Sequence, residues 1–320
     1  MNSRPLGLNR TGSASDRSWV FRHSDIGPAL ALGVLMAWIA VARAEEPRRP
    51  KKGDWPMWGG STDRNMVSDE KGIPAKWDMK AKTNIKWTAP LGSQTYGNPV
   101  VACGKIFIGT NNTGEYRPHS TGDKGIVLCF EEKTGKMLWQ ATHDKLPTGQ
   151  VNDWPEQGIC SSPVVEGDRL YYVSNRAELV CADVNGFLDK ENDGPFTDEK
   201  WKEEQDADFV WLLDMIEELG VFPHNLATSS PVIAGDTVFL ITSNGVDEGH
   251  LNLPAPDAPA FIAVDKKTAK VLWTRSDPGK NTLHGQWSSP AYGVIQGRAQ
   301  VLFGGGDGWV YSLDPKTGDI

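Results

Sequence analysis

An eleven-residue phrase recurs in this chain and constrains its fold more than any other feature. Residues 129–139 read CFEEKTGKMLW and residues 263–273 read AVDKKTAKVLW. Both copies place a small residue first, an acidic residue third, a Thr-Gly or Thr-Ala pair in the middle and a tryptophan last. A third copy, SLDPKTGDI, occupies residues 312–320. Internal repetition with so long a period is typical of propellers and solenoids.

Each copy of the phrase belongs to a longer repeat that predicts four short β-strands. A Ser-Ser-Pro motif, or Gly-Asn-Pro in the first repeat, opens the repeat and precedes a short apolar run and a polar turn. An alternating apolar run and a turn rich in Asn, Ser and Gly come next, before the phrase itself. Strands joined by such turns form the antiparallel meander of a propeller blade. The four opening prolines are Pro99, Pro163, Pro231 and Pro290.

The sequence therefore predicts an all-β fold, a β-propeller with about four four-stranded blades in this chain. The tryptophans that end the phrase are expected to be buried between neighbouring blades. Trp87 is expected to lie in a lone fourth strand that closes the ring. Ala269 stands where the other copies have glycine, which predicts mild strain or a changed turn because glycine tolerates a positive φ. The phrase-ending tryptophans are Trp139, Trp211 and Trp273.

The N-terminal residues have the composition of an export signal. Four arginines precede an apolar run over residues 26–42, and an Ala-x-Ala site ends at Ala44. This pattern predicts a signal peptide over residues 1–44, cleaved after Ala44, and a linker over residues 45–53. The expected location is the periplasm or the exterior. The 17-residue run is at the short end for a membrane span, and an uncleaved membrane anchor is the alternative.

Acidic residues are concentrated in one insertion. The chain has a net charge of −8, and residues 183–208 contain ten acidic residues against three lysines. This acidic insertion, residues 184–209, separates Cys181 from Trp211 by 30 positions, where the other copies have 10. No basic stripe is present, which argues against a nucleic-acid partner. An acidic loop favours a cation or a basic protein surface instead.

Part of this insertion resembles a calcium-binding loop. Oxygen ligands at alternate positions before a glycine suit a hard cation, and the segment that ends at Gly194 has this pattern. The glutamate expected at the end of such a loop is one position early. The segment is therefore a candidate calcium site, weighed against a solvated acidic loop that binds no ion. Its ligands would be Asp189, Glu191, Asp193 and Glu199.

A second candidate site lies just before the opening motifs. The first strand of each blade lines the axis of a propeller, so the segments that lead into it are expected to meet at one mouth of the channel, where ligands bind. Each histidine could equally be structural, and the different contexts of His224 and His284 argue against a symmetric metal site. The candidates are Asp153, Trp154, Glu156, His224, Asn225, His284, Gln286 and Trp287, with Gln94 and Tyr96 beside them.

The cysteines are expected to be unpaired. Cys129 and Cys181 occupy the small first position of the phrase, and equivalent positions on adjacent blades are too far apart for a disulfide. Cys103 lies in a predicted turn and Cys160 just before an opening motif. Neither a haem-attachment motif nor a zinc spacing is present.

The phrase, with the lead-in over Gly305–Tyr311, resembles the pyrroloquinoline quinone (PQQ)-type propeller repeat. Quinoprotein dehydrogenases and the non-enzymatic outer-membrane assembly lipoprotein share this repeat. The segment DWPMWGG, residues 54–60, resembles the start of exported bacterial proteins built on it. The resemblance covers residues 54–320 and implies a ring of seven or eight blades, so we expect the propeller to be incomplete at its C-terminal end.

The resemblance leaves the function of the chain open. The dehydrogenases hold PQQ against a disulfide of adjacent cysteines with Ca²⁺ beside it, but this chain has no adjacent cysteines. We therefore expect an exported, non-catalytic binding or scaffold propeller with a protein or small ligand at its mouth. The alternative is a PQQ- or metal-dependent quinoprotein oxidoreductase, with PQQ and Ca²⁺ as cofactors. A carbohydrate-active propeller is a third hypothesis and rests on Trp154 and Trp287.

Overall fold

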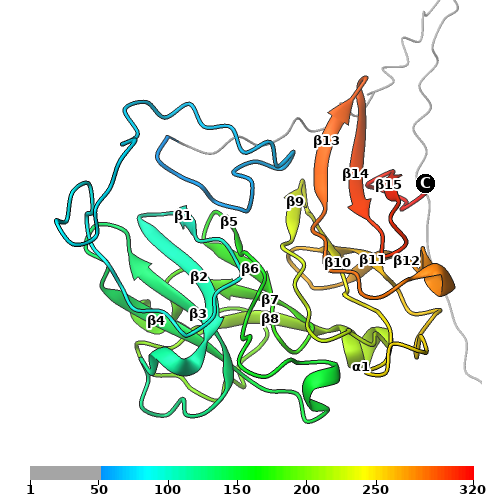
Figure 1. Ribbon diagram of the computed structural model, residues 1–320, viewed down its shortest axis with the longest axis horizontal. Helices are drawn as coiled ribbons and strands as arrows, with labels where there is room; N and C mark the ends of the chain where they lie inside the picture. The colour runs from blue at the N-terminus through cyan, green and yellow to red at the C-terminus, as the bar shows by residue number, and fades with distance from the viewer. Residues whose placement is uncertain (1–51) are drawn as a thin grey trace, which may run out of the picture. The chain divides into compact units, whose positions relative to one another are not determined.

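The computed structural model describes residues 52–320, which form four antiparallel sheets, the consecutive blades of a propeller (Figure 1). Strands pair in chain order within each sheet, as in a meander, which confirms the predicted all-β propeller. The predicted signal peptide and most of the linker lie outside the described residues. No helix within residues 52–320 is long and apolar enough to cross a membrane.

The blades have four, four, four and three strands. A short helix, α1 (Met215–Leu219), follows the second blade. Blade 1 contains β1 (Val100–Ala102), β2 (Lys105–Asn111), β3 (Lys124–Glu131) and β4 (Met137–Asp144); blade 2 contains β5 (Val164–Glu166), β6 (Arg169–Val173), β7 (Glu178–Asp183) and β8 (Phe209–Asp214); blade 3 contains β9 (Val232–Ala234), β10 (Thr237–Ile241), β11 (Phe261–Asp265) and β12 (Val271–Arg275); blade 4 contains β13 (Ala291–Ile295), β14 (Arg298–Gly304) and β15 (Val310–Leu313).

The Ser-Ser-Pro motifs join neighbouring blades at their first strands. The second serine accepts a hydrogen bond from the backbone N–H of the equivalent residue in the preceding blade. Asn98 donates to Ser162 Oγ over 2.8 Å, and Ser162 and Ser230 donate to the hydroxyls of the next blades over 2.9 Å each. The first serine binds its own blade, as where Ser161 Oγ donates to the carbonyl of Val173. Both hydroxyls therefore satisfy backbone groups that the short first strands leave unpaired.

The small first residue of the phrase lies directly opposite its tryptophan. Cys129 pairs with Trp139 across β3 and β4, and Cys181 pairs with Trp211 across β7 and β8. The register shifts just after the small residue in each case, which makes a β-bulge. Both cysteines are fully buried, which confirms the predicted small-residue position. Within the described residues, all four cysteines are free thiols.

Each indole binds the turn of the following blade. Trp139 Nε1 donates to the carbonyl of Val184, Trp211 to that of Lys266 and Trp273 to that of Pro315. These acceptors occupy the same position, one residue after the acid of the phrase. The tryptophans therefore lie between neighbouring blades, as predicted.

Trp87 makes the same contact outside any strand. Its Nε1 donates to the carbonyl of Glu132 over 2.9 Å, and a Cβ on Gly135 would lie 2.5 Å from its ring. No strand forms around Trp87, so that part of the prediction is wrong, because the side-chain contact does not need a sheet. Ala269 keeps the turn of the other copies with φ of 61°. A left-handed alanine costs roughly 1 kcal/mol, which agrees with mild strain.

The segment from Trp55 to Arg64 crosses the first strands of three blades. Trp55 forms a bridge with Val101, and the carbonyl of Pro56 accepts from Val165 N over 2.8 Å. Further on, the carbonyl of Thr62 accepts from Tyr292 N, also over 2.8 Å. The guanidinium of Arg64 donates to the carbonyls of Trp58, Ser230, Pro231 and Pro290.

The acidic insertion packs on blade 1. Gln140 of β4 forms a parallel bridge with Asp206, and Ala207 N donates to the carbonyl of Gln140 over 3.0 Å. Arg117 donates to both carboxylate oxygens of Asp206. The insertion therefore covers the outer edge of β4, which would otherwise expose unpaired backbone groups.

Candidate functional site at the mouth of the blades

The segments that precede the first strands meet, and they surround a cavity of about 370 Å³. Hydrogen bonds hold these segments together. Trp154 N donates to the carbonyl of Asn225 over 2.7 Å, and Trp287 Nε1 donates to the carbonyl of His224 over 3.1 Å. The cavity is lined by Trp154, Gln157, Asn225, Leu226 and Trp287.

The indoles of Trp154 and Trp287 make the lining of this cavity aromatic. Trp154 and Trp287 are 37% and 38% exposed, although tryptophan is usually more buried. Amides from Gln157 and Asn225 and the apolar chain of Leu226 complete the lining. A second cavity of about 390 Å³ shares Trp287, Gln157 and Leu226 and is otherwise lined by Trp58, Tyr96, Asn98, Cys160, Ser162, Thr228 and Ser230. Both linings are aromatic and polar without charged side chains.

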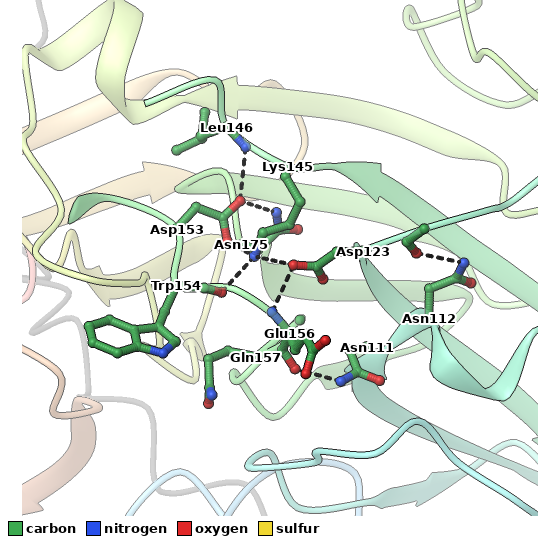
Figure 2. A network of polar contacts seen from close by, with 12 residues as sticks. Asn111, Asn112, Asp123, Lys145, Leu146, Asp153, Trp154, Glu156, Gln157 and Asn175 are labelled. Carbon is green, nitrogen blue, oxygen red and sulfur yellow. Dashed lines mark hydrogen bonds and ion pairs between the residues drawn. The ribbon is translucent and has the colours of Figure 1, made fainter. Parts of the chain in front are cut away.

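The side chain of Asp153 belongs to a polar network and does not line the cavity (Figure 2). Its carboxylate pairs with Lys145 and accepts hydrogen bonds from Leu146 N over 2.9 Å and Asn175 Nδ2 over 2.7 Å. Burial raises the pKa of Asp153, and the bond from Lys145 opposes that shift. In Figure 2 the ring of Trp154 points away from this network. The network therefore anchors the segment that presents the indole.

Two more predicted mouth residues are held by backbone contacts. Glu156 N donates to Asp123 Oδ2 over 2.7 Å, while its side chain is exposed. Gln286 is buried, and its Nε2 donates to the carbonyl of Asn244 over 3.0 Å. These residues shape the mouth without lining its cavity.

Three imidazoles converge beside Trp287. His224 Nε2 lies 2.9 Å from Nε2 of His284 and 3.2 Å from Nε2 of His250. The ring of Trp287 lies 5.1 Å from that of His284 between centroids. The sequence predicted His224 and His284 but missed His250, which lies in an inserted loop after β10, outside the repeat pattern.

The orientation of His224 is fixed by the backbone. Its Nδ1 lies 2.7 Å from the carbonyl of Val246, which can only accept, so Nδ1 carries the hydrogen and Nε2 presents a lone pair. His224 is fully buried, and burial lowers its pKa. Nε2 of His224 is therefore directed at the other two imidazoles.

The predicted calcium ligands have separate partners. Asp189 accepts from Glu191 N over 3.1 Å, Asp193 pairs with Arg169 over 2.9 Å and Glu199 accepts from Asn192 over 3.3 Å. In residues 52–320, two groups of three ligand atoms from His, Cys, Asp or Glu lie within 4.8 Å of one another, and neither group contains a predicted calcium ligand. These groups are His224, His250 and His284, and His119, Glu203 and Asp206.

Asp208 is the most perturbed carboxylate of the acidic insertion. Its Oδ2 accepts from Asp193 N over 2.8 Å, whereas its Oδ1 is buried with no hydrogen-bond partner in the described part of the chain. The pKa of Asp208 is raised to about 6, chiefly by burial and also by the charges of Glu199, Asp193 and Asp183, while the hydrogen bond from Asp193 N opposes the shift.

Replacing Asp208 with Asn is expected to stabilise the protein at pH 7. Because the folded pKa is raised, the folded state binds the proton more tightly, and stability falls as pH rises from about 4 to about 6. After discounting for solvent screening, the variant should gain about 1 kcal/mol at pH 7 and lose this pH dependence. Urea unfolding without calcium measures the gain. A calcium ion at this cluster would instead make wild type the more stable protein when Ca²⁺ is added, and equal stability without Ca²⁺ would contradict the prediction.

The family model described as outer membrane protein assembly factor BamB matches residues 75–193 and 227–320. The chain belongs to this PQQ-repeat family. The interval between the two matched segments contains most of the acidic insertion.

Several known proteins are similar to this family member. Lupanine 17-hydroxylase [cytochrome c] of a Pseudomonas species is 23% identical over 313 residues, which cover 94% of this chain and 36% of the relative. BamB from Moraxella catarrhalis is 17% identical with a TM-score of 0.41, over 72% of this chain and 49% of that one. Quinohemoprotein alcohol dehydrogenase ADHIIG from Pseudomonas putida HK5 is 15% identical with a TM-score of 0.48, over 84% and 39%. This chain therefore spans about half or less of the length of these relatives.

PQQ, the cofactor that the family suggests, does not fit the two cavities at the mouth. PQQ is a tricarboxylate, and its charge requires cationic side chains or a metal nearby. Neither of the two cavities at the mouth is lined by a Lys or Arg side chain. Cys160 lines the larger cavity as a free thiol whose pKa burial raises to about 12. The two cavities at the mouth therefore suit a neutral ligand.

Proposed function

We propose that this protein is an exported, non-catalytic propeller that binds an uncharged protein segment at its mouth. The observation that carries the proposal is the cavity between the half-exposed indoles of Trp154 and Trp287. Tryptophan is prominent among residues that dominate protein interfaces, and rings beside amides suit apolar side chains and peptide groups. Membership of a family described as an assembly factor supports a role in protein binding.

The proposal is tested by peptide selection on the full chain. A displayed library of random peptides is selected on wild type, and affinities of the enriched peptides are then measured. Trp154→Ala should weaken them about 30-fold, because a central tryptophan contributes about 2 kcal/mol or more. Trp309→Ala is the matched control, since Trp309 is 72% exposed and lies outside the cavities. Equal binding to wild type and Trp154→Ala, or no enrichment of any peptide on wild type, would refute it.

A quinoprotein oxidoreductase is the second candidate. The similarity to lupanine 17-hydroxylase extends over 94% of the chain, which favours testing it. The protein is incubated with PQQ and Ca²⁺, desalted, scanned for a bound chromophore and assayed with alcohols and an electron-accepting dye. We expect neither retained chromophore nor turnover, and either result would replace the binding proposal.

A further inference from the structure

Three chain segments bring imidazole nitrogens together beside the mouth. His224 precedes β9, His284 precedes β13, and His250 lies in the loop that follows β10. One ring nitrogen from each histidine lies within 4.8 Å of those of the other two, and His224 Nε2 is close to Nε2 of both partners. His224 is buried, whereas His250 and His284 are exposed, so the group opens to solvent on one side.

The backbone around this group permits the close approach. Val246 N donates to the carbonyl of His284 over 3.0 Å, and His224 Nδ1 donates to the carbonyl of Val246. A Cβ on Gly245 would lie 2.7 Å from Cβ of His224 and 2.6 Å from the carbonyl oxygen of His284. Position 245 therefore requires a glycine if His224 and His284 are to approach each other this closely.

The loop that presents His250 is also held in place. Asp247 accepts hydrogen bonds from Leu251 N over 2.9 Å and from Asn252 Nδ2 over 2.7 Å, which closes a short turn around His250. The carbonyl of Asp247 accepts from His250 N over 3.0 Å. These contacts present the third imidazole towards the other two.

From this geometry we propose that His224, His250 and His284 bind one divalent transition-metal ion, of the zinc and copper class, through their Nε2 atoms. Neutral imidazole is a preferred ligand of these ions, and a carbonyl partner on the opposite ring nitrogen is the usual support for a ligating histidine. With metal–nitrogen bonds of about 2.05 Å, the distances of 2.9 and 3.2 Å correspond to angles of about 90° and about 103° at the metal. Both angles are compatible with a metal ion that three protein ligands bind and that keeps open coordination positions.

The second group of potential ligands differs in its charge balance. Arg117 already donates to both oxygens of Asp206 and pairs with Glu203, so a cation is built into that group. His119 stacks on Trp201 with ring centroids 5.0 Å apart. The histidine group beside Trp287 has no such internal cation among the residues that the structure describes, and it is accordingly the metal site.

Metal binding is measured on the untagged full chain after removal of metals with a chelator. Zn²⁺ is titrated by calorimetry, and Co²⁺ is titrated as a visible-absorption probe of nitrogen coordination. Wild type should bind one equivalent of each. His250→Asn and His284→Asn should each lower the affinity at least about 100-fold, because each removes a direct ligand. Asn suits position 250 because it tolerates the left-handed backbone there, with φ of 57°.

Three controls separate this site from others. Leu251→Ala and Leu283→Ala change exposed neighbours of the ligands and should bind as wild type does. His119→Asn alters the second group and should also leave binding unchanged. Circular dichroism checks that each variant is folded. No stoichiometric binding by wild type, unaltered affinity in His250→Asn, or loss only in His119→Asn would overturn the proposal. No peptide is present, so the outcome is independent of the proposed binding function.

Discussion

Trp139→Ala is expected to lower the free energy of unfolding by about 4 kcal/mol. The indole is fully buried, packs on Phe107 with ring centroids 5.8 Å apart and donates to the carbonyl of Val184 over 3.1 Å. Truncation would remove this packing, leave a cavity between two blades and deprive a buried carbonyl of its donor. Urea unfolding followed by circular dichroism gives the change.

Two further variants test the cause of this loss. Trp139→Phe keeps the ring contact with Phe107 and loses the hydrogen bond, so it should cost about 1 to 2 kcal/mol. Trp309→Ala removes an indole that is 72% exposed and should change stability by less than about 0.5 kcal/mol. If Trp139→Ala were no worse than Trp309→Ala, the tryptophan of the phrase would not join the blades.

Arg64→Met is expected to lower the free energy of unfolding by about 3 kcal/mol. The guanidinium donates to carbonyls of the N-terminal segment and of the segments before β9 and β13, and its carbon Cζ lies 4.9 Å from the ring of Trp58. Hydrogen bonds from a charged donor contribute about 1.5 to 3 kcal/mol each, and methionine would leave these carbonyls without a donor.

Controls for Arg64 separate shape from charge. Arg64→Lys keeps the charge but lacks the planar fork that reaches several carbonyls at once, so it should recover less than half of the loss. Arg298→Met changes an exposed arginine of β14 and should be close to neutral. Full recovery by lysine would show that charge alone matters at this position.

The repeat phrase predicted the fold because its residues act within one blade or between sequence neighbours. The alternation of strands and turns, the small residue opposite Trp139 and the burial of the indoles all follow from local pattern. The contact of Trp87 was harder to predict, because the sequence suggested a strand and the structure uses only the side chain. Arg64 carried no signal, since its partners are backbone carbonyls distant in sequence.

The site was also predictable only in part, because several of its contacts join residues that are distant in sequence. Trp154, Asn225 and Trp287 line the cavity as the position of the opening motifs suggested. Asp153 has the same position in sequence, but its carboxylate is taken by Lys145 and Asn175, which no pattern linked to it. His250 lies in an insertion without a repeat partner, and only the folded loop brings it to the other histidines.

The direction of the indole contacts has a consequence for the growing chain. The acceptor of each tryptophan is made after it, 45 residues later for Trp139, 55 for Trp211 and 42 for Trp273. At synthesis rates of about 5 to 20 residues per second, the acceptor emerges about 2 to 11 s after the indole. Until the acceptor has been synthesised, the tryptophan of the preceding blade has no hydrogen-bond partner. During synthesis, the blade made most recently is therefore the segment most exposed to aggregation or to a chaperone.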